Sequence, residues 1–469
     1  MWQSALAQPS ISRRAALQAG MLTFLGLNND RLRRLQAASA TTETKPKQRA
    51  HSCVFIFLFG GQSHIDLWDM KPDAPREIRG EFLPIETNVG GVRICEHLPL
   101  MAKQMDKVCL VRSMSHKMPV HGPACSEIYS GREYFGPPVT DQATPKDWPS
   151  LSSMVNRFGR KKDAGLPTSV VLPWYTQFVG QDRRIAGQTG ARMGEEFNPF
   201  LIAGNPNSTH FEVQGLSGGA TLPQLKQRER LQKSLEALAE DRIPDSANIE
   251  SLQRHYRTAY SMIRSSIMAD ALQLDRETES LRDHYGRTRF GQSLLLSRRL
   301  VESGVNLVTV NWDDDHKDDK VSPHWDTHVD NFPKLKSRLC PPFDRGLSAF
   351  LEDLDQRGLL ETTLVVALGE FGRTPKVGAI SQNGMTTPTG RDHWPHAFSA
   401  IVAGGGVPGG QVYGSTTRTG GYVKDRPASP ADLAATVFEH LGIDPTLEYE
   451  DRFMQIPQQL CVGEPLQLA

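Results

Sequence analysis

The chain has 469 residues and carries 53 basic and 53 acidic side chains, so its formal net charge at neutral pH is zero. Because it lacks the basic excess that is typical of nucleic-acid-binding proteins, we expect no nucleic-acid partner. Six cysteines without a Cys-x-x-Cys pair do not make a disulfide framework in a chain of this length. The composition indicates a large globular protein whose chemistry must be sought in local motifs.

The first forty residues have the pattern of an export signal. Ser12-Arg13-Arg14 precedes an apolar stretch, Ala15 to Leu27, which is too short for a permanent membrane span. Ala38-Ser39-Ala40 then has the small-x-small pattern that signal peptidase cleaves. The paired arginines favour the twin-arginine translocase as export partner, with a cytoplasmic amphipathic arm as the alternative. We therefore expect residues 1–40 to be a twin-arginine signal peptide and residues 41–469 to be the exported domain, in the periplasm or at the cell surface.

Apolar runs next to glycines predict the strands of a buried sheet. The run from Ser52 to Phe59 ends in Gly60-Gly61, as a central parallel strand buried on both faces would. The runs Val305 to Val310 and Thr363 to Leu368 repeat the pattern, each after an apparent helix. The two helices are expected over Leu294–Ser303 and Phe343–Gln356. Three further strand candidates are Val108–Val111, Ser169–Leu172 and Phe398–Ala403. The order predicts an α/β fold with a doubly wound, mostly parallel sheet flanked by helices.

Two further helical regions are expected. Between residues 221 and 289, leucines recur at helical spacing among charged residues, which predicts a helical insertion whose charged face is solvated. Asp432 to Leu441 is expected to form the last helix. No apolar run outside the leader approaches the roughly 20 residues that a membrane-spanning helix needs, so we expect no integral membrane span.

Possible metal ligands follow the predicted strands, where a doubly wound sheet binds its ligands. His64 and Asp66 come after the first strand and would share a face in an extended chain. Asp326 and His328 follow the Val305 strand and have the same spacing. The strand ending at Leu368 leads to further candidates at Glu370, Asp392, His393 and His396. One such cluster alone is more often a surface hydrogen bond, so the hypothesis depends on several clusters coinciding at strand ends.

The mixture of imidazoles and carboxylates indicates the kind of metal. Nitrogen and oxygen together suit zinc, manganese or iron better than calcium, which prefers oxygen alone. We therefore expect a divalent metal, with zinc or manganese favoured over calcium. Arg373 follows the same strand as Glu370, and its guanidinium could hold a tetrahedral anion bidentately beside the metal. The alternative for Arg373 is a buried ion pair with Glu370.

Four motifs occur in order along the chain: Gly60-Gly61-Gln62-Ser63-His64-Ile65-Asp66, Trp325-Asp326-Thr327-His328, Gly369-Glu370-Phe371-Gly372-Arg373-Thr374-Pro375 and Gly390-Arg391-Asp392-His393-Trp394-Pro395. Together they resemble the motifs of an exported bacterial family, the proteins containing domain of unknown function 1501. The resemblance runs from about Phe55 to the C-terminus. That family in turn resembles the alkaline phosphatase and sulfatase superfamily, whose metal sites cleave phosphate or sulfate esters.

The resemblance implies roles for individual residues. Asp326 and His328 look like the superfamily's central ligand pair, and His393 or His396 could be its late histidine. Glu370 stands where a strand-end aspartate would be, with Phe371 at a histidine position. Gly60-Gly61 replaces the first-strand aspartate, which leaves His64 or Asp66 as substitutes.

A separate segment is similar in layout to the sulfatase segment that carries the nucleophile. It runs from His121 to Arg132, and its layout puts His121 at the nucleophile position. A formylglycine sulfatase needs Cys-x-Pro-x-Arg, and no cysteine in the chain has that pattern. The resemblance therefore disfavours a standard sulfatase.

The leading functional hypothesis is an exported metal-dependent hydrolase of phosphate, sulfate or related esters. Its substrate would be a small anionic ester or a sulfated or phosphorylated glycan. Metals would neutralise the anion, Arg373 would orient it, and His121 or a metal-activated water would attack. His121 or His116 could instead act as general acid or base.

Two alternatives remain open. The first is a catalytically inactive binding or scaffold protein for a glycan or cell-surface ligand, in which tryptophans beside the histidines, Trp68, Trp325 and Trp394, could stack on sugars. The second is a serine hydrolase using Ser63, because Gly61-Gln62-Ser63-His64-Ile65 is one residue short of the Gly-x-Ser-x-Gly motif.

Overall fold

The computed structural model describes the greater part of the chain from Gln48 onward. The described residues are 48–136, 143–160, 165–178, 184–213, 265–313, 319, 322–381 and 387–468, with isolated positions between 224 and 261. The expected signal peptide, residues 1–40, lies outside the described residues, and so does most of the expected insertion at 221–289. The described end of that insertion contains two helices, α9 (Ser266–Leu272) and α10 (Glu279–Tyr285). In the described part of the chain, no helix combines the length and the apolar character needed to cross a membrane.

An eight-stranded sheet forms the centre of the unit that begins at Gln48, with strand order β12-β4-β11-β8-β1-β7-β5-β6. β11 is antiparallel to both of its neighbours, and the other pairings are parallel. The strands are β1 (Ser52–Phe57), β4 (Val108–Met114), β5 (Ser169–Leu172), β6 (Phe200–Leu201), β7 (Leu307–Asn311), β8 (Thr363–Leu368), β11 (Phe398–Ala403) and β12 (Gln411–Tyr413). The predicted mostly parallel sheet is confirmed, and each of the six predicted strands is present.

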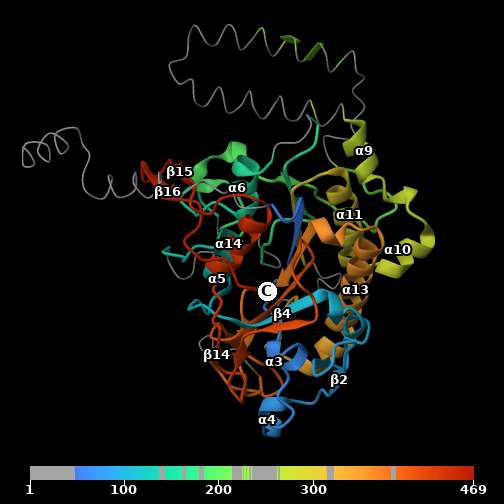
Figure 1. Cartoon of the computed structure of the whole chain (residues 1–469), viewed down its shortest axis with the longest axis vertical. Helices are drawn as coiled ribbons and strands as arrows, with labels where there is room; N and C mark the ends of the chain where they lie inside the picture. The colour runs from blue at the N-terminus through green and yellow to red at the C-terminus, as the bar shows by residue number, and fades with distance from the viewer. Residues whose placement is uncertain are drawn as a thin grey trace, which may run out of the picture. The chain divides into compact units, whose positions relative to one another are not determined.

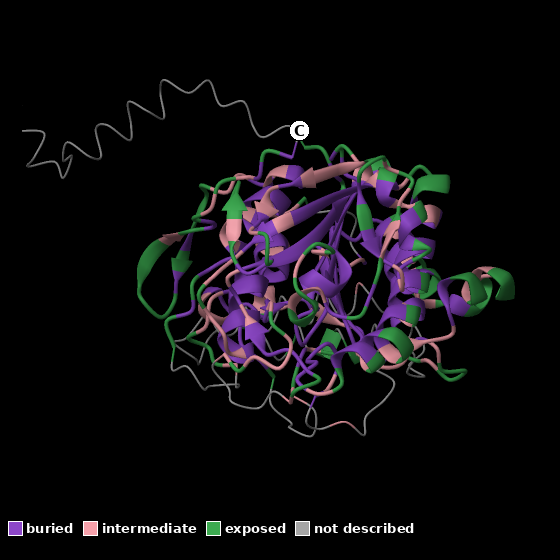
Figure 2. Ribbon diagram, turned by 90° about the horizontal axis from the view of Figure 1, so that it is seen from below, coloured by how far each residue is buried: buried purple, intermediate pink, exposed green. Residues whose placement is uncertain are grey.

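Two groups of helices cover the two faces of the sheet, as Figure 1 shows. One group contains α11 (Arg289–Ser303) and α13 (Cys340–Gln356), and the other contains α5 (His121–Ser130), α6 (Leu151–Phe158) and α14 (Pro430–His440). Alternate side chains of β1 pack against different groups: Val54 and Ile56 belong to the α11 and α13 core, whereas Phe55 and Phe57 belong to the other core. The central strands are therefore buried on both faces, as expected for a continuous apolar run (Figure 2).

The ends of the main helices follow local capping signals. α14 begins with a capping box in which the Ser429 side chain accepts from the Asp432 backbone N–H and the Asp432 side chain reaches back to Ser429. α11 begins at Arg289, five residues before the predicted start at Leu294, because Thr288 caps its first turn. Its end at Ser303 agrees with the prediction, because Gly304 adopts a left-handed conformation with φ of 110°.

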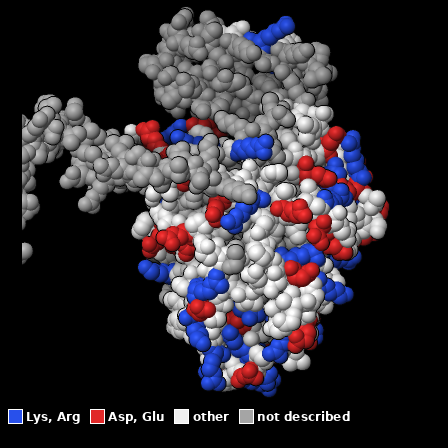
Figure 3. Space-filling view, viewed as in Figure 1, with Lys and Arg blue, Asp and Glu red and all other residues white. Residues whose placement is uncertain are grey.

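Short elements beyond the strand ends bring distant segments together. α3 (His64–Leu67) follows β1 directly. β9 (Gly372–Arg373) and β10 (His393–Trp394) form an antiparallel pair that places Arg373 opposite His393. The remaining short helices and strands are α4 (Arg76–Arg79), α12 (Asn331–Lys334), β2 (Pro84–Glu86), β3 (Arg93–Cys95), β13 (Ser415–Thr416), β14 (Val423–Asp425), β15 (Glu448–Asp451) and β16 (Ile456–Gln459). On the face drawn in Figure 3, basic and acidic side chains of the described residues are interspersed, in agreement with the balanced composition.

Candidate metal centre

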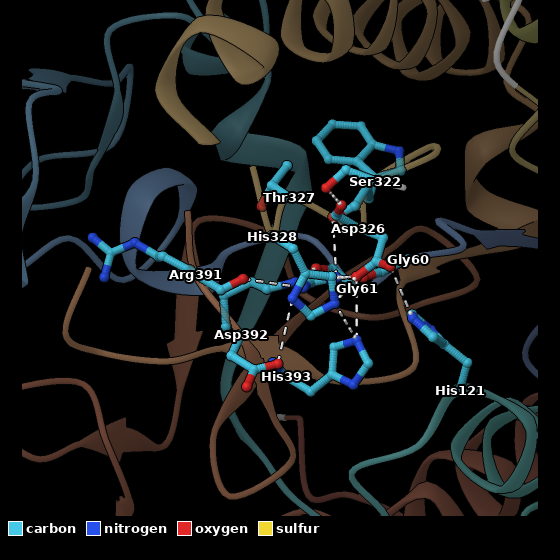
Figure 4. Close-up of polar contacts among 12 residues, drawn as sticks. Gly60, Gly61, His121, Ser322, Asp326, Thr327, His328, Arg391, Asp392 and His393 are labelled. Atoms are coloured by element: carbon cyan, nitrogen blue, oxygen red, sulfur yellow. Dashed lines mark hydrogen bonds and ion pairs between the residues drawn. The ribbon is translucent and has the colours of Figure 1, made fainter. Parts of the chain in front are cut away.

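Four side chains converge at the carboxyl ends of the central strands. His121 is the first residue of α5, Asp326 and His328 lie on the connection after β7, and His393 opens β10. One ligand atom from each residue lies within 4.8 Å of the others. All four residues are buried, and Figure 4 shows the imidazoles grouped around the Asp326 carboxylate. This is the edge of the sheet at which doubly wound folds bind their ligands.

The distances within the cluster match those between neighbouring ligands of one metal ion. The Nε2 atoms of His328 and His393 lie 3.0 and 3.2 Å from Asp326 Oδ1. The Nε2 atom of His121 lies 3.2 Å from Asp326 Oδ2, and the Nε2 atoms of His328 and His393 are 3.0 Å apart. A zinc–nitrogen bond of about 2.0–2.1 Å places neighbouring ligands about 3.0–3.4 Å apart, depending on the coordination number.

Each of the three imidazoles is held from behind at its Nδ1 atom. His121 Nδ1 lies 2.5 Å from Glu370 Oε1, and His393 Nδ1 lies 2.7 Å from the carbonyl oxygen of Pro119. His328 Nδ1 lies 3.4 Å from Asp392 Oδ1. Metal-binding histidines commonly donate their second N–H to such an acceptor, which fixes the tautomer and turns the other nitrogen toward the metal.

The acceptors at Nδ1 show which ring nitrogens are free of a proton and could therefore bind a metal. Since the Pro119 carbonyl can only accept, the proton of neutral His393 is on Nδ1, and its Nε2 carries a lone pair. The same assignment for His328, next to the Asp392 carboxylate, brings two lone pairs to within 3.0 Å of each other. A cation between them, shared with Asp326, would satisfy both. Three imidazole nitrogens and a carboxylate therefore fit a divalent transition metal.

Arg373 fixes the position and charge of Asp326. Its Nη2 atom lies 2.5 Å from Asp326 Oδ1, and its Nε atom donates to the Gly61 carbonyl at 2.9 Å. Further donations go to the carbonyls of Gly60 and Arg391. Although burial would raise the pKa of Asp326, the nearby Arg373 and His121 outweigh it and hold this pKa well below its ordinary value. Asp326 is therefore an ionised carboxylate at the centre of the cluster.

The three histidines do not share one electrostatic environment. Burial alone would lower the pKa of His121, but the Asp326 and Glu370 carboxylates outweigh it and raise this pKa to about 9. Burial and the neighbouring His121 lower the pKa of His393 to about 3. His121 lies between two carboxylates, which favour its positively charged form when no metal is bound.

A model of the family described as Protein of unknown function (DUF1501) matches residues 50–461. The chain belongs to the DUF1501 family. No curated protein matches it in sequence.

Several solved structures are similar to this DUF1501 chain at a distance. A sulfatase, PsFucS1 from Pseudoalteromonas sp., is 13% identical over 92% of this chain and 76% of its own, with a TM-score of 0.37. An alkaline phosphatase from the Antarctic bacterium TAB5 is 10% identical over 78% of this chain and 94% of its own, with a TM-score of 0.34. The lipoteichoic acid synthase LtaP from Listeria monocytogenes is 10% identical over 85% of this chain and 74% of its own, with a TM-score of 0.34. These similarities are too remote to transfer the role of any residue.

The DUF1501 motifs contribute unequally to the centre. Of the eight predicted ligands, Asp326, His328 and His393 are in the cluster. Glu370 and Asp392 lie behind it, where they face the Nδ1 atoms of His121 and His328. The resemblance had implied that Glu370 stands at the position of a metal ligand. In the structure, its carboxylate instead accepts a hydrogen bond from the Gly60 backbone N–H at 3.0 Å.

The structure does not bring His64, Asp66 or His396 into the cluster. Residues 64–67 form helix α3, so His64 and Asp66 do not share one face as they would in an extended chain. Asp66 forms a bidentate ion pair with Arg391, with two distances of 2.8 Å. His64 Nε2 lies 2.8 Å from the Gly420 carbonyl. His396 lies against the rings of Trp394 and Tyr422.

The three residues predicted to be catalytic are also placed differently from one another. His121 lies within the cluster, where it can serve as a ligand. The His116 side chain is buried, with Nε2 2.5 Å from the backbone carbonyl of Glu370, and this burial lowers the pKa of His116 to about 4. Arg373 pairs with Asp326, which differs from the Glu370 partner considered as its alternative.

The structure also bears on the serine-hydrolase alternative. Ser63 is buried and its hydroxyl donates to Asp66 at 2.7 Å. A serine nucleophile instead needs a histidine that can take its proton. The Asp66 carboxylate that Ser63 contacts is already engaged with Arg391, so this arrangement does not favour the alternative.

The sequence analysis did not include His121 among the possible metal ligands, although the structure places it in the cluster. His121 lies seven residues after the end of β4, and helix α5 begins with it, so the spacing within the connection gives no indication of its partners. The relevant signal was positional: β4 runs parallel to β1 within the sheet, so its carboxyl end lies at the same edge. Applying the strand-end rule to the Val108 strand would have added His121 to the candidates.

Proposed function

We propose that this chain is an exported metal-dependent hydrolase of phosphate, sulfate or related esters. One observation carries the proposal: three Nε2 atoms converge on the Asp326 carboxylate while three acceptors hold the imidazoles from behind. The donor set suits zinc or manganese better than calcium, because three of its four atoms are nitrogens. A divalent metal bound there would supply Lewis-acid polarisation of an anionic ester.

The protein's own residues would prepare the site for such a substrate. Arg373 keeps Asp326 ionised and in place without contacting the substrate itself. Glu370 orients His121, which is 8% exposed and is the most accessible histidine of the cluster. With a proton held between Asp326 and Glu370, His121 would be an alternative proton donor to the leaving oxygen if it is not a ligand.

The substrate is proposed to be a small anionic ester or a sulfated or phosphorylated glycan outside the cytoplasm. The paired arginines and the cleavage pattern of residues 1–40 support export by the twin-arginine translocase. That route carries folded proteins, so a metal could be loaded before export. The periplasm or the cell surface is the proposed location.

The test combines metal content with turnover. Protein purified without chelators is expected to contain stoichiometric zinc or manganese by elemental analysis and to hydrolyse 4-nitrophenyl phosphate, bis(4-nitrophenyl) phosphate or 4-nitrophenyl sulfate. His328→Ala is expected to lose both properties, because it removes a ligand from the centre. The matched control is His284→Ala, which removes an exposed histidine on α10. A folded wild-type protein without bound metal, or ester cleavage that is unchanged in His328→Ala, would contradict the proposal.

A binding protein that holds the metal without turnover is the second candidate. The contacts of Arg373 favour this candidate. Each of its three guanidinium nitrogens already donates to a protein acceptor, so Arg373 does not orient a substrate anion as the hydrolase hypothesis had expected. Stoichiometric metal with no activity across an ester panel, together with binding on a glycan array, would support this candidate over the hydrolase.

A further inference from the structure

A pocket of about 330 Å³ opens at the carboxyl ends of β1, β5 and β7. This volume is within the range of small-molecule sites. Most of its wall consists of ring side chains, which are Phe59, Trp174, Tyr175, Phe178, Trp312 and His324. Asn311, Asp313, Thr176 and Gln177 add polar groups to the lining. The pocket therefore offers apolar faces together with a few hydrogen-bonding groups.

The pocket lies beside the candidate metal centre. The Phe59 and Phe178 rings, which line it, have their centroids 5.4 and 5.8 Å from that of the His121 imidazole. His324, another wall residue, comes two residues before Asp326 and lies 5.6 Å from Phe59. A molecule in the pocket would thus be separated from the metal ligands by about one layer of side chains.

Trp174 is held rigidly although its ring is exposed. Its indole N–H donates to Asp313 Oδ2 at 2.9 Å, and its backbone carbonyl accepts from Asn311 Nδ2 at 2.7 Å. Trp174 is nevertheless 38% exposed. An indole restrained by hydrogen bonds is a preorganised stacking surface, because less conformational freedom is lost when a ligand binds.

The charges of the pocket argue against a cationic ligand. Asp313 is the acidic residue in the lining, and its carboxylate is paired with Arg289 and with the Trp174 indole. An aromatic cage without a free negative charge has less to offer an ammonium group. A sugar ring instead presents an apolar C–H face to an indole and hydroxyls to the surrounding amides and imidazole.

The backbone of His324 also indicates a constrained position. Its φ of 55° is in the left-handed region, which residues other than glycine adopt at a cost of about 1–3 kcal/mol. The residue is nevertheless buried in the pocket wall, so its surroundings impose this conformation. Such strain is concentrated at ligand-binding and catalytic sites.

We propose that this pocket binds a sugar ring of the substrate, which stacks on Trp174 and forms a hydrogen bond with His324. The inference rests on the proposed function, because it identifies the alcohol part of the cleaved ester as a carbohydrate. It deepens that function by giving Trp174 a role in specificity that is separate from the metal centre.

The test measures binding separately from turnover. Saturation-transfer NMR and calorimetry with galactose 6-sulfate, glucose 6-sulfate and the matching 6-phosphates would be carried out on the full exported domain. Wild-type protein is expected to bind at least one of these sugars, and Trp174→Ala to bind it at least tenfold more weakly. Trp174→Phe should retain part of the affinity because it keeps a ring, and His324→Asn should lose affinity while tolerating the left-handed backbone.

Phe453→Ala is the matched control, because it removes an exposed ring in the turn between β15 and β16, outside the pocket lining. Its sugar affinity should equal that of the wild type. Hydrolysis of 4-nitrophenyl esters should also be unchanged in Phe453→Ala, since Phe453 lies outside both the pocket lining and the cluster.

The outcomes separate the two proposals. Binding that depends on Trp174 in a protein without ester cleavage would sustain the pocket assignment and overturn the hydrolase. Ester cleavage with no sugar binding, or with sugar binding that is unaffected by Trp174→Ala, would sustain the hydrolase and overturn the pocket assignment.

Discussion

At the scale of single residues, the centre is distinguished from ordinary buried polar groups by what stands behind each imidazole. Three histidines each have an acceptor at Nδ1, and the acceptors come from three different segments. His64 shows the contrast, since its Nε2 contacts the Gly420 carbonyl and its Nδ1 is buried without a hydrogen-bond partner. The arrangement around Asp326 is therefore organised on both sides of each ring, as in known metal sites.

Asp392 provides a test of this interpretation. Its Oδ1 accepts from the His393 backbone N–H at 2.8 Å and lies 3.4 Å from His328 Nδ1. Asp392→Asn should leave the four ligands in place but weaken metal binding about 10–100-fold, because the orienting charge behind His328 is lost. Chelator competition would measure the change. Unchanged affinity would show that Asp392 has no role in orienting the ligand.

Asp66 tests whether a residue outside the cluster has a structural role and not a role in metal binding. It was predicted to be a ligand, whereas the structure pairs it with Arg391 in a fully buried ion pair. Asp66→Asn should therefore lower the free energy of unfolding by about 3–5 kcal/mol, because it leaves a buried guanidinium unpaired. In the fraction that remains folded, the metal stoichiometry should equal that of the wild type. Loss of metal from a folded Asp66→Asn protein would restore Asp66 to the ligand set.

At the scale of elements, the sheet was more predictable than the site. Continuous apolar runs such as Ser52 to Phe59 are determined locally, because strands buried on both faces need no polar alternation. The site depends on contacts that no local pattern encodes: Asp66 and Arg391 are 325 positions apart, and nothing near Asp66 in sequence distinguishes a metal ligand from an ion-pair partner. Only the general rule for strand ends pointed to the region in which the structure places the cluster.

The segment after β1 packs closely against the backbone of Asp326, and this contact gives a prediction at the scale of elements. A Cβ atom added to Gly60 would lie 2.3 Å from the backbone nitrogen of Asp326, and Gly60 has a φ of 109°. Gly60→Ala should therefore displace the connection and reduce metal binding as well as stability. Gly358→Ala is the control, since Gly358 also has positive φ but nothing within 4 Å of the added atom. It should cost only about 1–2 kcal/mol and leave metal binding intact. Equal effects of the two substitutions would mean that the close approach does not matter.

At the scale of the whole molecule, the centre joins segments that are far apart in the sequence. His121 opens α5 against one face of the sheet, Asp326 and His328 follow β7, and His393 belongs to the β9–β10 pair. Two acidic residues behind the cluster involve further segments: Glu370, which contacts His121, follows β8, and Asp392, which contacts His328, comes directly before β10. A metal bound at this point would link elements from both halves of the chain to one another.

This linkage predicts that stability depends on metal. An ion that binds the folded chain but not the unfolded chain stabilises it by about 2.7 kcal/mol when its concentration is a hundred times Kd. Chelation should therefore lower the Tm of the wild type by several degrees, and added zinc or manganese should restore it. His328→Ala should start from the lower Tm and respond to neither treatment, because a ligand is missing. His284→Ala should behave like the wild type. If chelation lowered the Tm of His328→Ala as much as that of the wild type, the stabilising ion would have to bind elsewhere, and the convergence of the three imidazoles would need a different explanation.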